Sequence, residues 1–203
     1  MRVMKSLLYI FIVLILFACA SSSKQVKYYS LTLNSDYQSL PTANHQDNTE
    51  HTHVIVEPVR LANFLRQEGL VLQIGEHEIV TANYHRWAEP LDEAIAKLLA
   101  HELNNKSDHY QFARKMGAWN QNAALHLRFE FDKFHATDNA KIVASGRYWL
   151  YEKNKTLKME HAFSVSSHLT RDGYLHAVEE LEQSIGQLSD QIIVSLDLLK
   201  RPN

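Results

Sequence analysis

Cysteine is almost absent from this chain of 203 residues, in which Cys19 is the single example. Residues 20–203 can form no internal disulfide, so the stability of a fold must come from its core. A Gly-rich phosphate loop, a Gly-x-Ser-x-Gly turn and a His-Glu-x-x-His zinc motif are also missing. No carboxylate pair is signalled as an acid and a base. We therefore expect a protein that is not an enzyme and uses no cofactor.

The chain also lacks any surplus of positive charge. Its formal net charge is −2, and no basic block or platform of aromatic and arginine residues occurs. These absences argue against nucleic acid as a partner.

Histidine, by contrast, is frequent, with 12 residues. His51 and His53 would lie on the same side of an extended chain, with His45 and Asp47 nearby, and such a cluster could hold a transition metal loosely. The segment is polar, offers no thiolate and fixes no geometry. We therefore favour solvated loop histidines over a metal site.

The first 18 residues have the layout of a bacterial secretion signal. Arg2 and Lys5 form a short positive start, residues 6–17 are almost wholly apolar, and small residues flank Cys19. The apolar stretch would form a helix of about 18 Å, which is too short for a hydrocarbon core of ~30 Å. A retained transmembrane anchor is therefore the weaker interpretation.

The last residues of this segment, Leu16-Phe17-Ala18-Cys19, resemble a lipobox, although the motif usually has a smaller residue than Phe17. The resemblance implies a lipoprotein that is cut before Cys19 and anchored by acyl chains such as palmitate on that residue. Ala20, in place of Asp, implies sorting to the outer membrane. An ordinary signal peptide with an incidental cysteine is the alternative. Residues 19–26 then form a flexible tether.

The remaining chain, 27–203, is long enough for one domain with a sizeable core. Runs of β-branched, aromatic or alternating apolar residues are candidate strands, at 27–33, 54–59, 70–74, 79–84, 125–131, 141–151 and 157–169. Gly75 marks a hairpin turn, and Leu61–Gln67 a helical turn. Residues 34–53 are polar and too many for a loop in a compact domain, so we expect a mobile insertion there.

Two amphipathic helices are also predicted. The first begins at Pro90, has apolar residues at helical spacing and ends at Asn104-Asn105. The second follows Asp172-Gly173, and a coiled-coil or membrane-surface helix is its weaker alternative. The expected fold is α+β, with a mainly antiparallel sheet of about five to six strands and both helices packed on one face.

The segment Tyr84–Leu91, between hairpin and helix, contains an unusual group of residues. In one interpretation Trp87 packs under the start of the helix, while Arg86 and Glu89 form ion pairs or caps at its rim. In the other, a partner-binding patch forms, because Trp, Tyr and Arg are the residues that anchor interfaces. The members of this patch would be Tyr84, Arg86, Trp87, Glu89 and Pro90. The residues alone leave both interpretations open.

A family resemblance follows from four of these segments: the lipobox, the strand from Lys27 to Leu31, the strand Val54–Val59, and above all Arg-Trp-Ala-Glu-Pro-Leu at 86–91. Together they resemble the PqiC-like family, auxiliary lipoproteins of ABC-type and MCE transport systems associated with membrane integrity. Leu61–Glu68 departs from the family, which tends to have prolines there.

The resemblance implies a non-enzymatic lipoprotein on the periplasmic face of the outer membrane. It would dock a PqiB-like, periplasm-spanning MCE protein and support the passage of phospholipid cargo between membranes. The resemblance also leaves a homo-oligomer open, since auxiliary subunits often surround a tubular partner. The alternative function is a lipid-binding carrier with its own acyl-chain cavity between sheet and helices. An activator of cell-wall enzymes is a weaker third hypothesis.

Overall fold

The computed structural model describes residues 24–31, 51–115 and 123–200. The predicted signal peptide (1–18), Cys19 with the first part of its tether, and residues 34–50 of the predicted insertion lie outside these ranges. The last residues of that insertion are described, and Thr52 and His53 belong to a strand. The expectation of an insertion up to residue 53 is therefore wrong at its end.

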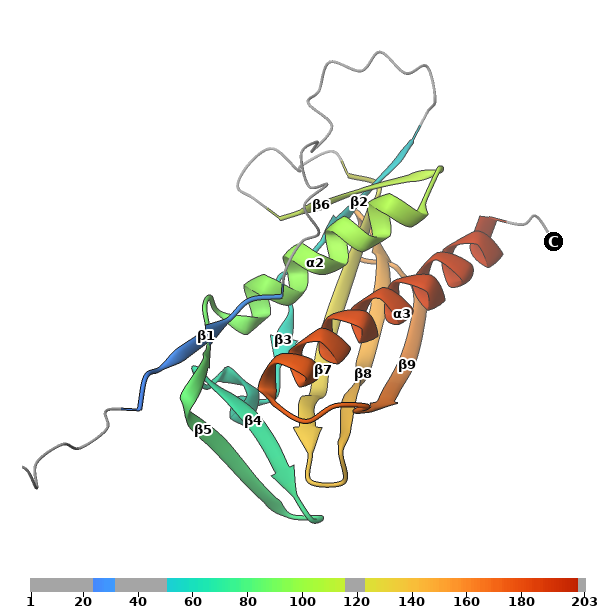
Figure 1. The fold of residues 1–203 in the computed structure, drawn as a ribbon. Helices are drawn as coiled ribbons and strands as arrows, with labels where there is room; N and C mark the ends of the chain where they lie inside the picture. Colours follow the sequence, from blue (N-terminus) through green and yellow to red (C-terminus); the bar gives the residue numbers. More distant parts are fainter. Residues whose placement is uncertain (1–23, 32–50, 116–122, 201–203) are drawn as a thin grey trace, which may run out of the picture.

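Nine strands, two α-helices and one 3-10 helix make up the described part of the chain. The strands are β1 (Lys27–Tyr29), β2 (Thr52–Val56), β3 (Arg60–Leu61), β4 (Gly69–Ile74), β5 (Glu78–Trp87), β6 (Tyr110–Arg114), β7 (Leu125–Thr137), β8 (Lys141–Glu152) and β9 (Leu157–His168). The helices are η2 (Asn63–Arg66), α2 (Leu91–Lys106) and α3 (Tyr174–Lys200). Both α-helices lie across the same face of one sheet, as predicted (Figure 1).

The sheet is mixed, which corrects the prediction of a mainly antiparallel sheet of five to six strands. Antiparallel pairing is confined to β4–β5, β7–β8 and β8–β9 within the described residues. The parallel pairs are β1–β5, β2–β6, β2–β7, β3–β7 and β4–β7. Residue periodicity reveals which face of a strand is buried but not the direction of its neighbour, so the parallel pairs could not be seen in advance.

The long strand β7 is the centre of this arrangement. One edge pairs along its length with β8, and the other pairs in succession with β2, β3 and β4. Its register shifts between Phe131 and Lys133, opposite Gly146 of β8. A Cβ atom on Gly146 would lie 1.9 Å from the carbonyl oxygen of Glu130, so only glycine fits this close approach.

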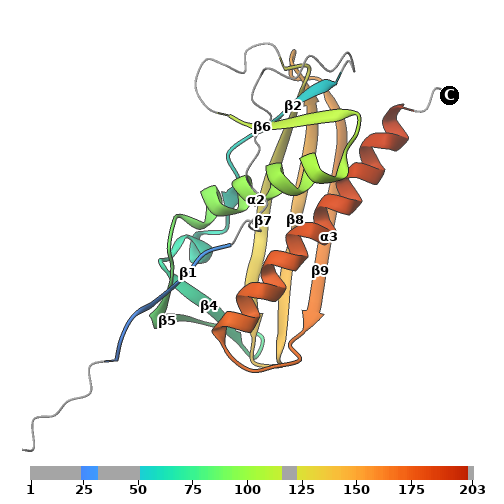
Figure 2. The same ribbon diagram turned by 45° about the horizontal axis from the view of Figure 1, so that its top comes forward.

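The main core lies between the sheet and the two helices. Phe129, Phe131 and Phe134 of β7 are among its largest fully buried side chains, and α3 covers β7, β8 and β9 (Figure 2). The helix α2 packs on β2 and β6 and contacts α3. Lys106 at the end of α2 reaches Asp190 of α3 at 2.7 Å and the carbonyl oxygen of Gly186 at 2.9 Å.

The hairpin β4–β5 confirms the predicted turn, with Gly75 at φ +59°. In Figure 1 it projects below the helices, with its tip remote from α2. The strand β5 extends past the predicted end at Tyr84 as far as Trp87. The first part of the motif, Tyr84–Trp87, therefore ends a strand, and Ala88, Glu89 and Pro90 connect it to α2.

Candidate functional site

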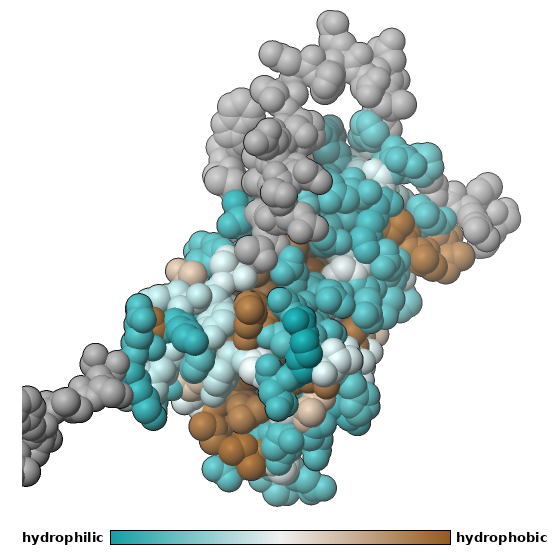
Figure 3. Space-filling model, viewed as in Figure 1, coloured by the Kyte–Doolittle hydropathy of each residue, from teal (hydrophilic) through white to brown (hydrophobic). Residues whose placement is uncertain are grey.

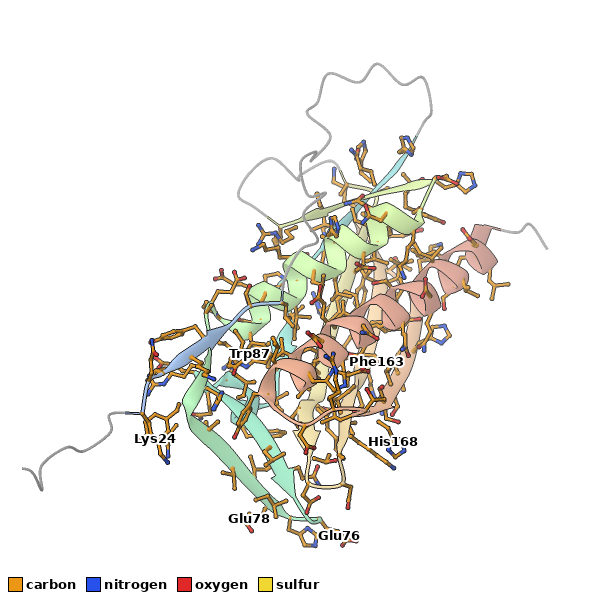
Figure 4. The ribbon with its side chains drawn as sticks, viewed as in Figure 1. Lys24, Glu76, Glu78, Trp87, Phe163 and His168 are labelled. Carbon is orange, nitrogen blue, oxygen red and sulfur yellow. The ribbon has the colours of Figure 1, made fainter. Side chains whose placement is uncertain are left out.

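Trp87 ends β5 and turns its side chain into the core (Figure 4). Only 8% of the residue is exposed, and its ring lies 6.5 Å from that of Phe134. Its backbone N–H donates to the carbonyl oxygen of Glu68 at 2.8 Å. The next amide, that of Ala88, donates to the carbonyl oxygen of Tyr29 at 2.7 Å. Three segments far apart in sequence therefore meet at this strand end.

The charged neighbours of Trp87 are paired around it. Arg86 donates to the Glu68 carboxylate at 3.0 Å, and Lys97 donates to Glu89 at 3.4 Å. These are the contacts that the structural interpretation of the motif expects, with a buried tryptophan and ion pairs at its rim. The partner-binding role of the same residues stays a prediction.

The helix α2 starts directly after this strand end. Pro90 is its N-cap residue, and the Pro90 carbonyl oxygen accepts from the amides of Glu93 at 3.1 Å and Ala94 at 3.0 Å. Asp92 and Glu93 place negative charge in the first turn, which favours the positive end of the helix dipole. The sequence therefore holds Trp87 rigidly between a strand and a helix start.

The strand β1 is held against β5 by an aromatic stack. The Tyr29 hydroxyl lies 2.7 Å from Nδ1 of His85, and the two rings are stacked. The His85 ring also stacks on Tyr174 of α3, with 3.8 Å between centroids. Burial, together with the nearby charge of Lys27, lowers the pKa of His85. The His85 imidazole thus connects β1, β5 and α3.

A surface groove of about 530 Å³ opens beside Trp87. We call it the junction groove, because β1, the segment after η2 and the start of α2 meet there. Its lining residues are Tyr28, Leu61, Arg66, Gln67, Glu68, Trp87, Ala88, Glu89, Pro90, Leu91 and Asp92. Three of the five predicted partner-binding residues, Trp87, Glu89 and Pro90, therefore line one hollow.

The other two predicted residues do not line the groove. Arg86 lies at its rim through the pair with Glu68, and Tyr84 is 43% exposed, with Nζ of Lys24 5.5 Å from its ring centroid. Sequence reasoning did not assign Tyr28 or Arg66 to the site. No local signal could have done so, because the pairing of β1 with β5 brings Tyr28 to this place.

A second, smaller hollow of about 240 Å³ also adjoins the start of α2, and Asp92 lines both. Beside it the Glu57 carboxylate accepts from Lys115 at 3.0 Å and lies 2.8 Å from Nδ1 of His126. Burial alone would raise the pKa of Glu57, but the hydrogen bonds from Lys115 and His126 lower it overall. This cluster joins β2, β6 and β7.

The predicted histidine cluster is described only in part, because His45 and Asp47 lie outside the described residues. Within residues 24–31, 51–115 and 123–200, no three His, Cys, Asp or Glu side chains are placed to share a metal ion. His176 instead packs at the start of α3, with Nδ1 3.1 Å from Glu179 and Nε2 accepting from the Thr170 amide at 3.2 Å. In the same ranges, no helix has the length and apolar character needed to cross a membrane.

Comparison with known proteins gives a family match over most of the chain. A model of the family described as ABC-type transport auxiliary lipoprotein component matches residues 31–193. The intermembrane transport lipoprotein PqiC of Escherichia coli (strain K12) is 27% identical over 155 residues, which are 73% of this chain and 79% of that protein. PqiC of Shigella flexneri matches with the same identity and coverage.

Solved structures share the fold. A crystal structure of an uncharacterized protein superposes with a TM-score of 0.69 at 24% identity, covering 85% of this chain and 99% of that one. A protein from Xanthomonas campestris gives a TM-score of 0.66 at 12% identity, with 83% and 93% covered. At these identities the likeness shows the arrangement of elements and nothing about binding.

Proposed function

The chain belongs to the ABC-type transport auxiliary lipoprotein component family, and on that premise we propose that it is a docking subunit of an envelope lipid-transport system. Cys19 is acylated and holds the domain 27–203 on the periplasmic face of the outer membrane. The domain binds a periplasm-spanning MCE protein and so supports lipid transport between membranes, without catalysis of its own. The name of the PqiC relatives, intermembrane transport lipoprotein, supports this role.

The junction groove carries the proposal. It combines a rigid floor with exposed walls: Trp87 is 8% exposed, whereas Tyr28 at the rim is 65% exposed. Interfaces depend on aromatic and arginine anchors in such hollows, and Arg66 adds a cation at the rim. Glu89 and Asp92 add carboxylates to the same lining. An aromatic floor with charges of both signs around it is suited to a protein segment.

The carrier alternative requires an enclosed apolar cavity. The two hollows reported above are open at the surface and have charged residues in their linings. Between sheet and helices, the described side chains of β7 and α3 fill the core, with Phe129, Phe131, Ile185 and Ile192 fully buried. These observations favour docking over the storage of acyl chains.

Photocrosslinking tests the proposal. A photoreactive amino acid replaces Gln67, an exposed residue in the lining of the junction groove. The control probe replaces Lys153, an exposed residue of the β8–β9 turn. In cells that express the MCE partner, we expect capture of the MCE protein at position 67 and not at position 153.

Two results would contradict docking through this groove. Capture of the MCE protein at both positions would mean nonspecific contact, and capture of lipid alone at position 67 would favour the carrier. A third variant, Trp87→Phe, keeps an aromatic core residue but shortens the floor of the groove. We expect it to reduce capture at position 67 while the protein stays folded by circular dichroism.

A further inference from the structure

The strands β1 and β5 carry exposed aromatic and aliphatic side chains. Tyr28 among them also lines the rim of the junction groove, whereas Tyr84 and Val80 do not line it. Tyr28 pairs in register with Arg86, so it lies on the same face of the sheet as Tyr84, two residues earlier in β5. Val80 lies further along β5 toward the hairpin tip, beyond a register shift in the β4–β5 pairing, and is also exposed. His85 and Trp87 point to the other face, toward α3 and the core. The exposed fractions are 65% for Tyr28, 43% for Tyr84 and 37% for Val80.

We call the exposed residues Lys24, Tyr28, Tyr84 and Val80 of this side of the molecule the anchor stripe. Nζ of Lys24 lies 5.5 Å from the Tyr84 ring centroid, which fixes the basic end of the stripe. Val80 lies four residues from Tyr84 on the same strand, or about 13 Å away. Figure 4 shows Lys24 at one end of this side of the molecule and the acidic residues Glu76 and Glu78 at the hairpin tip, the other end.

The short length of chain between Cys19 and Lys24 keeps the anchor stripe near the membrane. The argument rests on the proposed function, in which Cys19 carries the acyl chains. Only residues 20–23 separate Cys19 from Lys24, and a fully extended chain spans at most about 18 Å between those two residues. Lys24 and its neighbour Tyr84 are therefore always close to the bilayer to which Cys19 is attached.

The chemistry of the stripe suits a phospholipid surface. Tyrosine is enriched at the boundary between headgroups and acyl chains, where its ring is apolar and its hydroxyl is hydrated. A lysine at the same level places its ammonium among the headgroup phosphates while its methylenes stay in the apolar layer. Val80 adds an aliphatic side chain, and the acidic tip lies at the end remote from the anchor.

A second exposed apolar patch lies far from the tether and can be compared with the anchor stripe. Val194, Leu198 and Leu199 lie on the last turns of α3 and are between 48% and 60% exposed. Figure 3 shows hydrophobic surface both there and toward the lower end of the hairpin. Figures 1 and 2 place the end of α3 on the side of the molecule opposite to β1. A short tether at Lys24 therefore brings the hairpin side, and not the end of α3, toward the membrane.

We propose that the anchor stripe lies in the headgroup layer of the membrane that holds the acylated chain, so that the domain is oriented and does not swing freely. Tyr84 then serves membrane contact, whereas Trp87, Glu89 and Pro90 remain in the junction groove. The groove would thus be presented at a fixed angle to a partner that approaches along the membrane.

Fluorescence quenching tests this orientation in the full acylated protein. Acylation consumes the thiol of Cys19, the single natural cysteine, so a new cysteine is the unique labelling site. Val80→Cys and Val194→Cys are matched variants, because both replace an exposed valine. Each is labelled with an environment-sensitive dye and reconstituted into vesicles of phosphatidylethanolamine and phosphatidylglycerol that contain nitroxide-labelled headgroups. We expect strong quenching and a blue shift at position 80, and neither at position 194.

The outcomes separate this inference from the proposed function. Mass spectrometry of the N-terminal peptide and sedimentation with vesicles first establish acylation and anchoring. A chain without acyl groups would overturn the anchoring and this inference together. An acylated, vesicle-bound protein whose label at position 80 is no more quenched than the label at 194 would overturn the orientation alone. The orientation would also be overturned if a photoreactive residue at position 80 captured a protein, and no lipid, in cells.

Discussion

The two halves of this molecule are built in different ways. From β7 onward, three long strands follow one another through tight turns and pair antiparallel, and α3 covers them. Before β7, the strands are mostly short, and those that meet β7 run parallel to it. We call these parts the C-terminal region, residues 125–200, and the N-terminal region, residues 24–31 and 51–115.

The difference separates stability from recognition. The largest aromatic cluster belongs to the C-terminal region, whereas the junction groove and the anchor stripe belong to the N-terminal region. Binding surfaces are commonly drawn from the less stable parts of a fold, because those parts expose backbone and side chains that a partner can use. We therefore expect substitutions in the two regions to differ in how much they lower the free energy of unfolding and in how far through the sheet their effects extend.

The largest effect is expected from Phe131→Ala. Phe131 is fully buried, and its ring contacts those of Phe134 at 5.8 Å and Phe163 at 5.0 Å. Removing it should lower the free energy of unfolding by about 3–5 kcal/mol, measured by urea denaturation. The matched change in the N-terminal region is Phe112→Ala, whose ring lies 6.2 Å from that of Tyr110. Equal losses of unfolding free energy for Phe131→Ala and Phe112→Ala would contradict the conclusion that stability is concentrated in the C-terminal region.

Gly146→Ala tests the close approach of β8 to β7. The new methyl group would meet the backbone oxygen of Glu130 at 1.9 Å, so the two strands must separate. We expect a loss of about 3 kcal/mol, at the upper end of overpacking, and a lower melting temperature by calorimetry. The control is Gly75→Ala at the hairpin tip, where no atom lies within 4 Å of the added Cβ and only the positive φ opposes alanine. A larger loss of stability for Gly75→Ala than for Gly146→Ala would contradict the conclusion that the close approach of β7 and β8 requires glycine at position 146.

Glu57→Gln tests a polar contact between the two regions, because Glu57 follows β2 and His126 belongs to β7. The pKa of Glu57 is below its ordinary value of 4.5 because Lys115 and His126 donate to the carboxylate. The ionised form therefore adds stability that is complete above the pKa of the unfolded chain and is lost as the pH falls through the lower pKa of the folded state.

At neutral pH we expect the Glu57→Gln variant to be less stable than the parent by about 1–2 kcal/mol, and the gap should close in acid. Denaturation curves over a pH series measure it. Glu78→Gln, at the exposed hairpin tip, is the control and should leave the free energy of unfolding at neutral pH unchanged. A gap that widens on acidification would show that the carboxylate does not act through these hydrogen bonds.

The smallest effect is expected from Tyr29→Phe. The change removes the hydroxyl that lies 2.7 Å from Nδ1 of His85 and should cost about 1 kcal/mol. Because β1 has three residues, we expect faster amide hydrogen exchange in β1 with little change in β7–β9. The control is Tyr84→Phe, since no hydrogen bond from the Tyr84 hydroxyl to another described residue is seen. Faster exchange throughout the sheet would mean that β1 stabilises more than its own attachment.

Local patterns predicted the C-terminal region well and the N-terminal region less well. The alternation from Leu125 to Phe131 predicted a strand, but β7 continues to Thr137. The reason is the register shift at Asp132 and Lys133, which are both exposed and displace the alternation by one residue. The strand β6 was missed because it is short and pairs in parallel with β2, far earlier in the chain.

The candidate site was predicted in its composition but not in its shape. The segment from Arg86 to Pro90 was recognised, and its burial and ion pairs match one of two open interpretations. The opposite wall of the groove, from Arg66 to Glu68, could not be predicted, because the sheet and not the sequence order brings it beside Trp87. The resemblance to the auxiliary lipoproteins did identify the family, which the match over residues 31–193 confirms.

The shared edge of β7 has a consequence for the order of folding. The strands β2, β3 and β4 are synthesised before β7, yet each needs a part of its edge, up to Thr137, to complete its pairing. The hairpins β7–β8 and β8–β9 need only short turns, whereas β2 must close a loop of about 70 residues, which is slow. We expect the C-terminal hairpins to form first and to act as the template on which the earlier strands assemble. A chain interrupted before β7 would contain every lining residue of the junction groove and still be unable to build it.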